Sequence, residues 1–203
     1  MNIALTMVKK SIKMITNPTR EAMIMKRQVN PFDYAGDICK ALPGGILLTT
    51  KRGEEVNTMT IGWGHIGIEW SIPIFVVYVR ESRYTKQLLE ENGEFTINVP
   101  MGEVDKSILG VCGTKSGRDM NKIETLGLHL EEPMSISVPG IKELPLTLEC
   151  KVVYKQKQDL SAIPEKILNR FYPEEDDTLH PGSPRDYHIA YYGQILKAYI
   201  IEE

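Results

Sequence analysis

The sequence predicts a mainly β protein, an antiparallel sheet or β-barrel with short helices. At least six strand-like segments stand against three short helical ones, and most links between strands have hairpin length. Strands and helices do not alternate regularly, which argues against a parallel sheet. The 203 residues are enough for one domain, and a hydrophobic share of 42% with a charged share of 25% is typical of globular proteins.

The first strands are expected soon after residue 44. Ile46–Thr50 is rich in residues that favour β structure, and Lys51–Glu54 contains a glycine suited to a hairpin turn. Val56–Trp63 is then the returning strand. Ile72–Arg80 is an almost continuous apolar run, which predicts a strand covered on both faces.

A helix is expected over Arg83–Asn92, with Ser82 as its N-cap and Gly93 as its C-terminal stop. Glu94–Val99 alternates like a strand and is followed by a proline. Two further short helices are predicted over Val104–Val111 and Pro164–Phe171, and two further strands over Leu146–Tyr154 and His188–Ile200, the last of which is long. Cys112–Asn121 is predicted to be a polar loop, and Pro173–Pro184 is a proline-rich stretch.

Charge is unevenly distributed along the chain. The first 28 residues contain six Lys and Arg and a single acid, Glu21, so their net charge is +5. Because the whole chain has a net charge of −3, the remaining residues have a net charge of −8. We therefore expect residues 1–28 to be a basic leader or N-terminal extension and residues 29–203 to be the functional domain. The extension lacks the apolar stretch of a secretory signal.

Several classes of protein are not expected. The chain has no overall basic excess, as a nucleic-acid binder would have, and no apolar run of about 18 residues, as a membrane span would need. Cys39, Cys112 and Cys150 form no CxxC pair and the four histidines are dispersed, so no metal site is predicted. Scarce, unpaired cysteines favour a reducing, cytoplasmic location.

Two glycine-containing motifs are interpreted as coincidental. Gly62–Gly67 matches G-x-G-x-x-G, but Ile68–Pro73 is too short and too β-branched to be the helix that a dinucleotide fingerprint requires. The segment is better interpreted as a turn or a close backbone approach after a strand. Gly110–Ser116 lacks the glycines of a phosphate-binding P-loop.

Three polar clusters indicate that the chain binds an anion. Arg80–Thr85 combines cations and hydroxyl groups with the start of a helix, where free N–H groups favour a phosphate. Gly113–Asp119 with Lys122 is a second loop rich in cations and hydroxyl groups, and Asn57–Thr60 with Trp63 is a polar and aromatic strand end. The alternatives are helix capping, a solvated turn and an amphipathic edge strand, respectively.

Taken together, in this order, the clusters resemble the flavin reductase-like family of FMN-binding split barrels, which includes flavoredoxins. The resemblance runs from about residue 41 to the end of the chain and is weaker after residue 149. The residues that carry it are Asn57–Trp63, Trp70–Pro73, Arg80–Thr85, Glu94–Asn98, Cys112–Asp119 and Lys122.

The resemblance implies an antiparallel Greek-key split barrel, usually a homodimer, that holds FMN near the subunit interface. No side chain is expected to be catalytic, because the flavin carries the redox chemistry. The resemblance places Asn57, Thr58, Met59, Thr60 and Trp63 near the ring and polyol chain of the cofactor. It places Ser82, Arg83, Tyr84, Thr85, Ser116, Gly117 and Lys122 near the phosphate. Arg80 is also implied in cofactor binding, with orientation of the loop as its alternative role.

The function implied is NAD(P)H-dependent reduction of FMN by hydride transfer to flavin N5, with NAD(P)H as co-substrate and a monooxygenase or an electron-transfer protein as further partner. Two alternatives remain at this point. One is an FMN-holding electron-transfer protein of the flavoredoxin type, without direct NAD(P)H oxidation. The other is a non-catalytic barrel that binds a phosphorylated ligand. Oxidation of pyridoxamine phosphate on a related barrel ranks below both.

Overall fold

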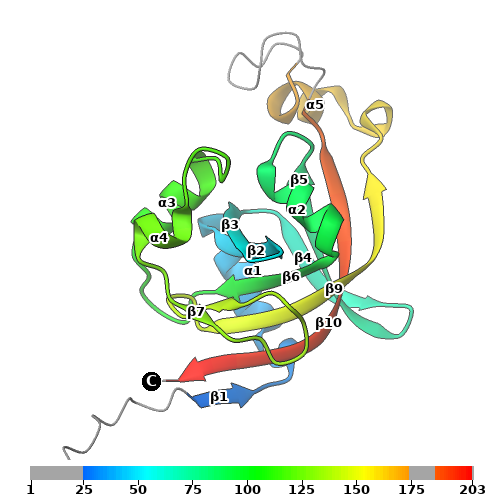
Figure 1. The fold of residues 1–203 in the computed structure, drawn as a ribbon. Coiled ribbons are helices and arrows are strands. Elements are labelled where there is room, and N and C mark those ends of the chain that lie inside the picture. Colours follow the sequence, from blue (N-terminus) through cyan, green and yellow to red (C-terminus); the bar gives the residue numbers. More distant parts are fainter. Residues whose placement is uncertain (1–24, 174–185, 203) are drawn as a thin grey trace, which may run out of the picture.

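The computed structural model describes residues 25–173 and 186–202, which fold around one curled antiparallel sheet (Figure 1). Its strands pair in the order β3-β2-β6-β9-β10-β5-β4, and β1 pairs with the end of β10. The strands of this sheet are β1 Met25–Gln28, β2 Ile46–Arg52, β3 Glu55–Ile61, β4 Gly64–Glu69, β5 Ile72–Arg80, β6 Glu94–Val99, β9 Leu146–Lys157 and β10 His188–Glu202.

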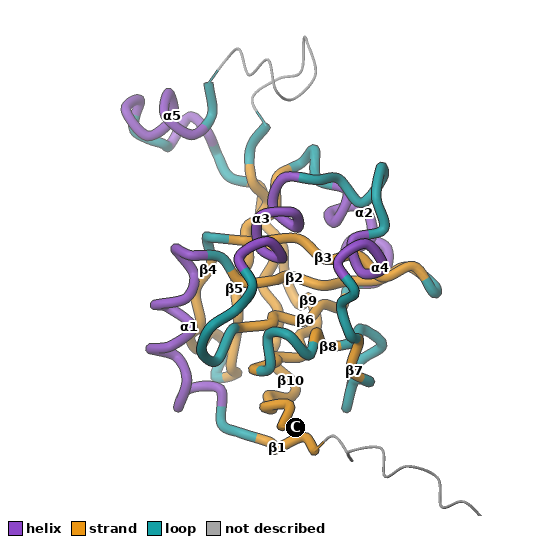
Figure 2. The backbone as a smooth tube through the Cα atoms, turned by 90° about the vertical axis from the view of Figure 1, so that its left-hand side faces the viewer, coloured by secondary structure: helices purple, strands orange, loops and turns teal. Residues whose placement is uncertain are grey.

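Short helices surround the sheet. The α-helices are α1 Ala35–Ala41, α2 Tyr84–Asn92, α3 Lys106–Thr114, α4 Lys122–Leu126 and α5 Glu165–Phe171. The 3-10 helices are η1 Pro31–Tyr34, η2 Leu42–Gly44 and η3 Leu160–Ala162, and a small second sheet pairs β7 Leu130–Glu131 with β8 Gly140–Ile141. Figure 2 shows α1 on a different side of the strands from α2 and α4, and α5 standing away from the barrel.

The position of β3 at the end of the sheet is the feature that matters for the site. β2 and β3 form a hairpin in which Arg52 pairs with Glu55, and Gly53 adopts a left-handed φ of 56° in the turn. β3 pairs with β2 along one edge and has no strand partner on its other edge among the described residues. That outer edge faces α3 and α4, and it leaves backbone groups available to a side chain or a ligand.

The main core fills the interior of the barrel. β5 contributes to both of its faces, because Phe75, Val77 and Val79 pack into the main core while Ile74 and Val76 join a smaller cluster on the other face. This confirms the expectation of a strand covered on both sides. Its predicted bounds, and those of β6, agree with the structure.

The N-terminal boundary differs from the expectation. The sequence predicts residues 25–28 to be part of the basic extension, but they form β1 and pair with residues 199–202 of β10. Backbone pairing along a free edge of β10 therefore adds these four residues to the sheet. Residues 1–24 and most of the proline-rich stretch lie outside the described residues.

Three further expectations need correction. Ser82 does not cap α2: the N-cap is Arg83, and no side chain caps this helix. The G-x-G-x-x-G segment has no helix after it, as expected, but most of it is strand rather than turn, because Gly64–Glu69 forms β4 as the hairpin partner of β5. The alternative, a close backbone approach, is confirmed at Gly64, where a Cβ atom would lie 2.9 Å from the carbonyl oxygen of Val76. The helix expected over residues 104–111 runs from Lys106 to Thr114, since Asp105 caps it by accepting from the N–H of Ser107 over 2.8 Å.

Candidate functional site

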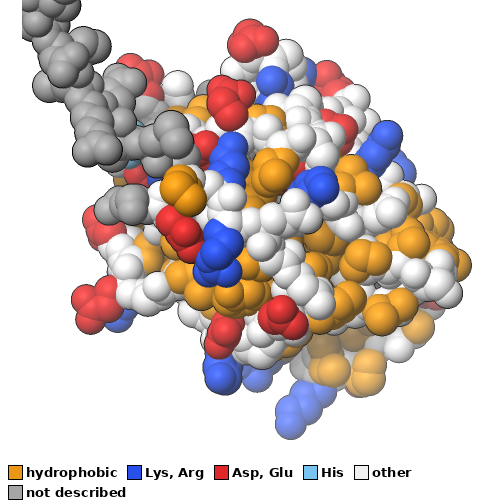
Figure 3. All heavy atoms as spheres, turned by 90° about the horizontal axis from the view of Figure 1, so that it is seen from below, with side chains coloured by type: hydrophobic (Ala, Val, Ile, Leu, Met, Phe, Trp, Pro, Cys, Tyr) orange, Lys and Arg blue, Asp and Glu red, His pale blue; other side chains and the backbone are white. Residues whose placement is uncertain are grey.

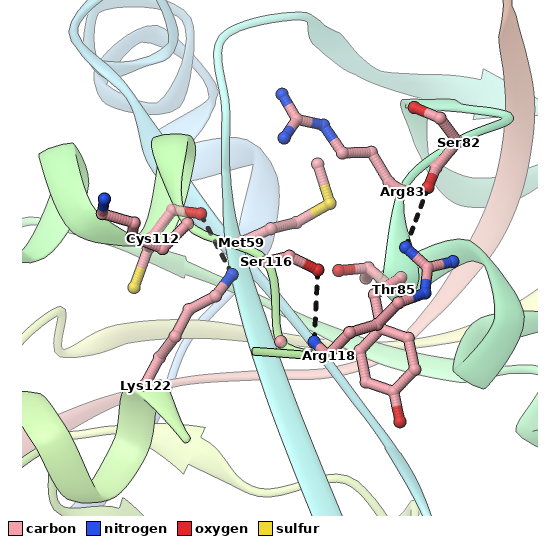
Figure 4. Close-up of a pocket in the computed structure, with 11 residues that line it drawn as sticks. Met59, Ser82, Arg83, Thr85, Cys112, Ser116, Arg118 and Lys122 are labelled. Atoms are coloured by element: carbon pink, nitrogen blue, oxygen red, sulfur yellow. Dashed lines mark hydrogen bonds between the residues drawn. The ribbon is translucent and has the colours of Figure 1, made fainter. Parts of the chain in front are cut away.

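A cavity of about 140 Å³ lies between β3, the start of α2 and the loop that follows α3. We call it the basic cavity, because Arg83, Arg118, Lys115 and Lys122 contribute to its wall (Figure 4). Its other lining residues are Met59, Ser82, Tyr84, Thr85, Cys112, Ser116 and Gly117. Residues from all three predicted clusters therefore meet in one place.

The first turn of α2 borders the basic cavity. The helix follows directly on the buried strand β5, and its N-cap residue, Arg83, offers no side-chain acceptor to the first turn. The first N–H groups of an α-helix have no partner within the helix and carry a partial positive charge. The first turn of α2, which contains Tyr84 and Thr85, is therefore suited to an anion.

Asn57 and the 115–118 loop are packed closely against this turn. Asn57 Nδ2 donates to Thr85 Oγ1 over 2.8 Å, and both side chains are buried. A Cβ atom at Gly117 would lie 2.2 Å from Asn57 Oδ1 and 2.8 Å from Tyr84 Cδ1. Only glycine therefore fits at position 117 when the loop is this close to β3 and α2.

Lys122 is a buried cation at the base of the basic cavity. It begins α4, and its Nζ donates to the carbonyl oxygens of Thr58 (2.8 Å) and Cys112 (3.3 Å). Burial, and then the nearby Arg83, lower the pKa of Lys122. It forms no ion pair with a carboxylate of the described residues, so a bound anion would supply the missing negative charge.

Two arginines complete the positive wall. Burial, and then the neighbouring Arg80, lower the pKa of the Arg83 guanidinium, which forms no hydrogen bond with the described residues. Arg118 lies over the ring of Tyr84, 5.1 Å from its centroid, and donates to the carbonyl oxygen of Ser82 over 3.2 Å. Figure 4 shows Arg83, Arg118 and Lys122 on different sides of Met59 and Ser116.

A second cavity, of about 190 Å³, adjoins the first at Met59 and Arg83. We call it the aromatic cavity, because Trp63, Tyr78 and His188 line it, together with Thr60, Ile61, Gly62 and Arg80. The Trp63 ring stacks at a tilt on the His188 ring, with centroids 4.7 Å apart, and meets Phe171 edge-on at 5.2 Å. Together the two cavities form a continuous site with cationic residues at one end and aromatic residues at the other.

His188 is held in its neutral form. Burial, and then Arg80 and Arg83, lower the pKa of His188 to about 3. Its Nδ1 lies 2.7 Å from the hydroxyl of Tyr172, which donates to Gln158 Oε1 over 2.6 Å. In this arrangement His188 presents an uncharged ring to the aromatic cavity across the physiological pH range.

Several predicted residues have side chains that are engaged elsewhere. The Thr60 hydroxyl donates to the carbonyl oxygen of Leu109 over 2.7 Å. The Tyr84 hydroxyl accepts from Arg52 over 3.0 Å and donates to Glu55.

Ser82 Oγ donates to Asp186 Oδ2 over 2.7 Å, and Arg80 donates to the carbonyl oxygens of Asp186 (2.8 Å) and Phe171 (3.0 Å). Arg80 therefore binds the end of α5 and the chain before β10, and it also lines the aromatic cavity. The Thr58 hydroxyl donates to the carbonyl oxygen of Leu48 within the sheet, and only the carbonyl oxygen of Thr58 reaches the site.

The sequence did not single out several residues of the site. Arg118 and Lys115 belong to the predicted loop, so its cluster of cations was the signal that could have selected them. Tyr78 and His188 stand on separate strands that pair in the barrel, and nothing in either segment indicates that they share a cavity. Asp186 is likewise brought to Ser82 only by folding.

Within residues 25–173 and 186–202, no three His, Cys, Asp or Glu side chains are grouped as a metal ion would require. None of the helices described here combines the length and the apolar character that would let it cross a bilayer.

Comparison with known proteins places the chain in a family. The model of the flavin reductase like domain matches residues 40–200. A protein of Archaeoglobus fulgidus is 41% identical over 100 residues, which is 49% of this chain and 55% of that relative. The alignment thus spans a little over half the length of that protein.

Solved structures show the same fold at low sequence identity. An FMN-binding domain of a flavin reductases-like enzyme from Shewanella baltica is similar with a TM-score of 0.56 and 17% identity, over 87% of this chain and 78% of that one. Nitrilotriacetate monooxygenase component B from Bacillus cereus has a TM-score of 0.57 and 18% identity, over 95% and 84%. The curled sheet is the split barrel of such structures, as expected. Because the family model matches most of its length, this chain belongs to the flavin reductase like domain family.

Proposed function

We propose that this protein binds FMN across the basic and aromatic cavities and reduces it with NAD(P)H. The observation that carries the proposal is the pair Arg83 and Lys122. Both are desolvated cations beside the basic cavity, and neither forms an ion pair with a described carboxylate. Cations in that state are stabilised by an anionic ligand, and FMN ends in a phosphate.

The basic cavity fits a phosphate group. Its cations lie around the N-terminus of α2, and the Ser116 hydroxyl also lines it. Gly117 has no side chain, so the loop backbone at this position can donate to a ligand. Backbone N–H groups at a helix start, together with Lys and Arg side chains, are the usual phosphate ligands in proteins. In the proposal Lys122, Arg83 and Arg118 supply charge, and Thr85 is held in place by Asn57.

The aromatic cavity fits a flat ring. Trp63, Tyr78 and the neutral His188 offer aromatic faces and edges, and Met59 lies between the two cavities. The free edge of β3 adds backbone groups that can bond to the polar edge of a ring. When bound, FMN would supply the redox chemistry, as the acceptor of a hydride from NAD(P)H. The side chains bind and orient it, which is a positioning contribution to the rate.

We also propose a homodimer. An aromatic patch covers the outer face of β4, β9 and β10, where the ring centroids of Tyr154 and Tyr192 are 5.0 Å apart and Trp70 lies 6.1 Å from Tyr154. Trp70 is 57% exposed and Ile68 is 71% exposed. Figure 3 shows hydrophobic side chains gathered on one side of the face seen from below. Patches of this kind mark protein interfaces, and sedimentation of the purified protein tests the dimer.

The proposed partners include a protein that receives reduced flavin or electrons. The similar structure from Bacillus cereus is named as a component of a monooxygenase, and we extend that role to this chain as a proposal. The three cysteines are free thiols, which supports the cytoplasm as the proposed location.

An anaerobic titration tests the main proposal. The purified protein, reconstituted with FMN, is expected to be yellow and to lose its visible absorbance when NADH or NADPH is added. Failure to bind FMN would overturn the proposal entirely. Tight FMN binding without bleaching by either nucleotide would overturn the NAD(P)H step and favour the electron-transfer alternative.

A further inference from the structure

A third opening, of about 440 Å³, adjoins the aromatic cavity at Gly62, Trp63 and Tyr78. The end of α1 and the start of η2 form its opposite wall. We call it the neutral cleft, defined by the two glycines that flank Trp63 and by Cys39, Leu42, Pro43, Trp63, Tyr78 and Gln158.

None of the residues that line the neutral cleft carries a formal charge. The two neighbouring cavities, by contrast, contain Arg83, Arg80 and Lys122. An anionic ligand in the cleft would lose hydration without gaining a counter-charge, whereas a neutral flat ligand would lose little. Trp63 is 39% exposed, so it offers such a ligand an aromatic surface on which to stack.

Two side chains of the cleft, Tyr78 and Gln158, have hydrogen-bond donors available. Burial raises the pKa of Tyr78, which therefore keeps its proton, and its hydroxyl forms no hydrogen bond with the described residues. Gln158 accepts from Tyr172 through Oε1, which leaves its amide N–H groups as donors. A flat, uncharged ligand that bears carbonyl oxygens would match these two donors and the aromatic surface.

We propose that the neutral cleft binds a quinone, which serves as the electron acceptor. The reduction step rests on the proposed function, because NAD(P)H is the electron donor. In the net reaction NAD(P)H, one proton and the quinone give NAD(P)⁺ and the hydroquinone. Two electrons leave the nicotinamide, both carbonyl oxygens become hydroxyl groups, and the second proton comes from water at the open mouth of the cleft.

Alkylation of Cys39 tests occupancy of the cleft without any flavin. Cys39 is exposed at the cleft, whereas Cys112 and Cys150 are 1% and 0% exposed and serve as internal controls. The probe is duroquinone, whose fully substituted ring has no free carbon for a thiol to attack. Duroquinone is expected to slow the reaction of Cys39 with iodoacetamide at least fivefold in a mass-spectrometric assay. An unchanged rate, or equal protection by a sulfonated benzoquinone, would overturn the proposal.

A matched pair of variants tests the acceptor role. Cys39→Phe narrows the cleft, and Lys40→Phe places the same ring on the next residue of α1, whose side chain is 84% exposed and outside the cleft. In the reconstituted protein Cys39→Phe is expected to raise the KM for duroquinone at least fivefold, with the Kd for FMN unchanged. Lys40→Phe should leave both constants unchanged.

The two proposals fail in distinguishable ways. Equal KM values for duroquinone in the two variants and the wild type would overturn the acceptor site while FMN binding stands. A protein that binds no FMN would overturn the proposed function, and protection of Cys39 would still report whether the cleft holds a quinone.

Discussion

The side chains of Asn57 and Thr85 join the edge strand β3 to the first turn of α2 through a buried hydrogen bond of 2.8 Å between Nδ2 and Oγ1. The bond fixes the distance between the two elements that border the basic cavity. Because Gly117 is packed against the same asparagine, the 115–118 loop is positioned by it as well. One amide thus aligns three of the segments that form the candidate site.

Replacing Thr85 with Val is expected to destabilise the protein by about 1–3 kcal/mol, because it leaves the buried Asn57 amide without its acceptor. FMN affinity should fall with it, since α2 is then less firmly placed. Urea unfolding and fluorescence titration with FMN measure the two effects. Thr85→Ser keeps the hydroxyl and is the matched control. Equal stability of the two variants would show that the bond contributes nothing.

Gly117→Ala is expected to displace the 115–118 loop. The added methyl group would meet Asn57 Oδ1 at 2.2 Å, and overpacking of this kind costs about 1–3 kcal/mol. We expect FMN binding at least tenfold weaker by titration. Gly110→Ala is the control, because a Cβ there has no neighbour within 4 Å and position 110 lies inside α3. A Gly117→Ala protein with wild-type affinity would contradict the assigned loop geometry.

Lys122→Met should weaken FMN binding by roughly 10- to 100-fold, the loss expected when a charged hydrogen bond of about 1.5–3 kcal/mol is removed. The control is Lys106→Met, which removes an exposed lysine outside the cavity. Isothermal calorimetry with FMN compares them. If both variants bind alike, Lys122 is not a phosphate ligand.

The lowered pKa of Lys122 also predicts a pH dependence of stability in the flavin-free protein. Between that lowered pKa and about 10.4, the value of a free lysine, the unfolded chain binds a proton that the folded protein does not. The free energy of unfolding of the wild type, relative to Lys122→Met, should therefore rise as the pH increases through this window. Urea denaturation at a series of pH values measures the difference, and a constant difference would contradict it.

The lowered pKa of His188 predicts a pH dependence of stability at acidic pH. This pKa is about 3, compared with about 6.5 for a free histidine. Between these two pH values, the imidazole of residue 188 is protonated in the unfolded chain and neutral in the folded protein. The wild type should lose up to roughly 1.4 kcal/mol of stability per pH unit as the pH falls through this window, and His188→Gln should lose less. His129→Gln, at an exposed ring, controls for the loss of a histidine. Parallel acid profiles for the wild type and His188→Gln would refute the assignment.

Most strands could be predicted from local patterns. β5 and β6 have the predicted bounds because an apolar run and a period-two alternation are properties of the segment itself. β4 was missed because its glycines favour a turn in isolation. Pairing with β5 makes it a strand, and a Cβ at Gly64 would lie only 2.9 Å from the carbonyl oxygen of Val76.

The candidate site was predictable to the extent that its residues share a segment. Thr85, Gly117 and Lys122 were selected as members of polar clusters, and the structure brings them to one cavity or its wall. Ser82 was selected for the same reason, but its hydroxyl donates to Asp186, 104 residues further along the chain. A local pattern shows which polar groups a segment contains, but it does not show which distant residue binds to them in the folded protein.

The sequence by itself determined the fold class, the family resemblance and the three clusters that could bind an anion, because these depend on short-range periodicity and on residues close together in the chain. Only the tertiary structure decided that β1 joins the sheet, that Ser82 and Arg80 are engaged with the chain before β10, and that Lys122 is buried without a described acid partner. Burial and pairing depend on strands that are distant in sequence, and they set both the charge balance of the site and the groups left free for a ligand.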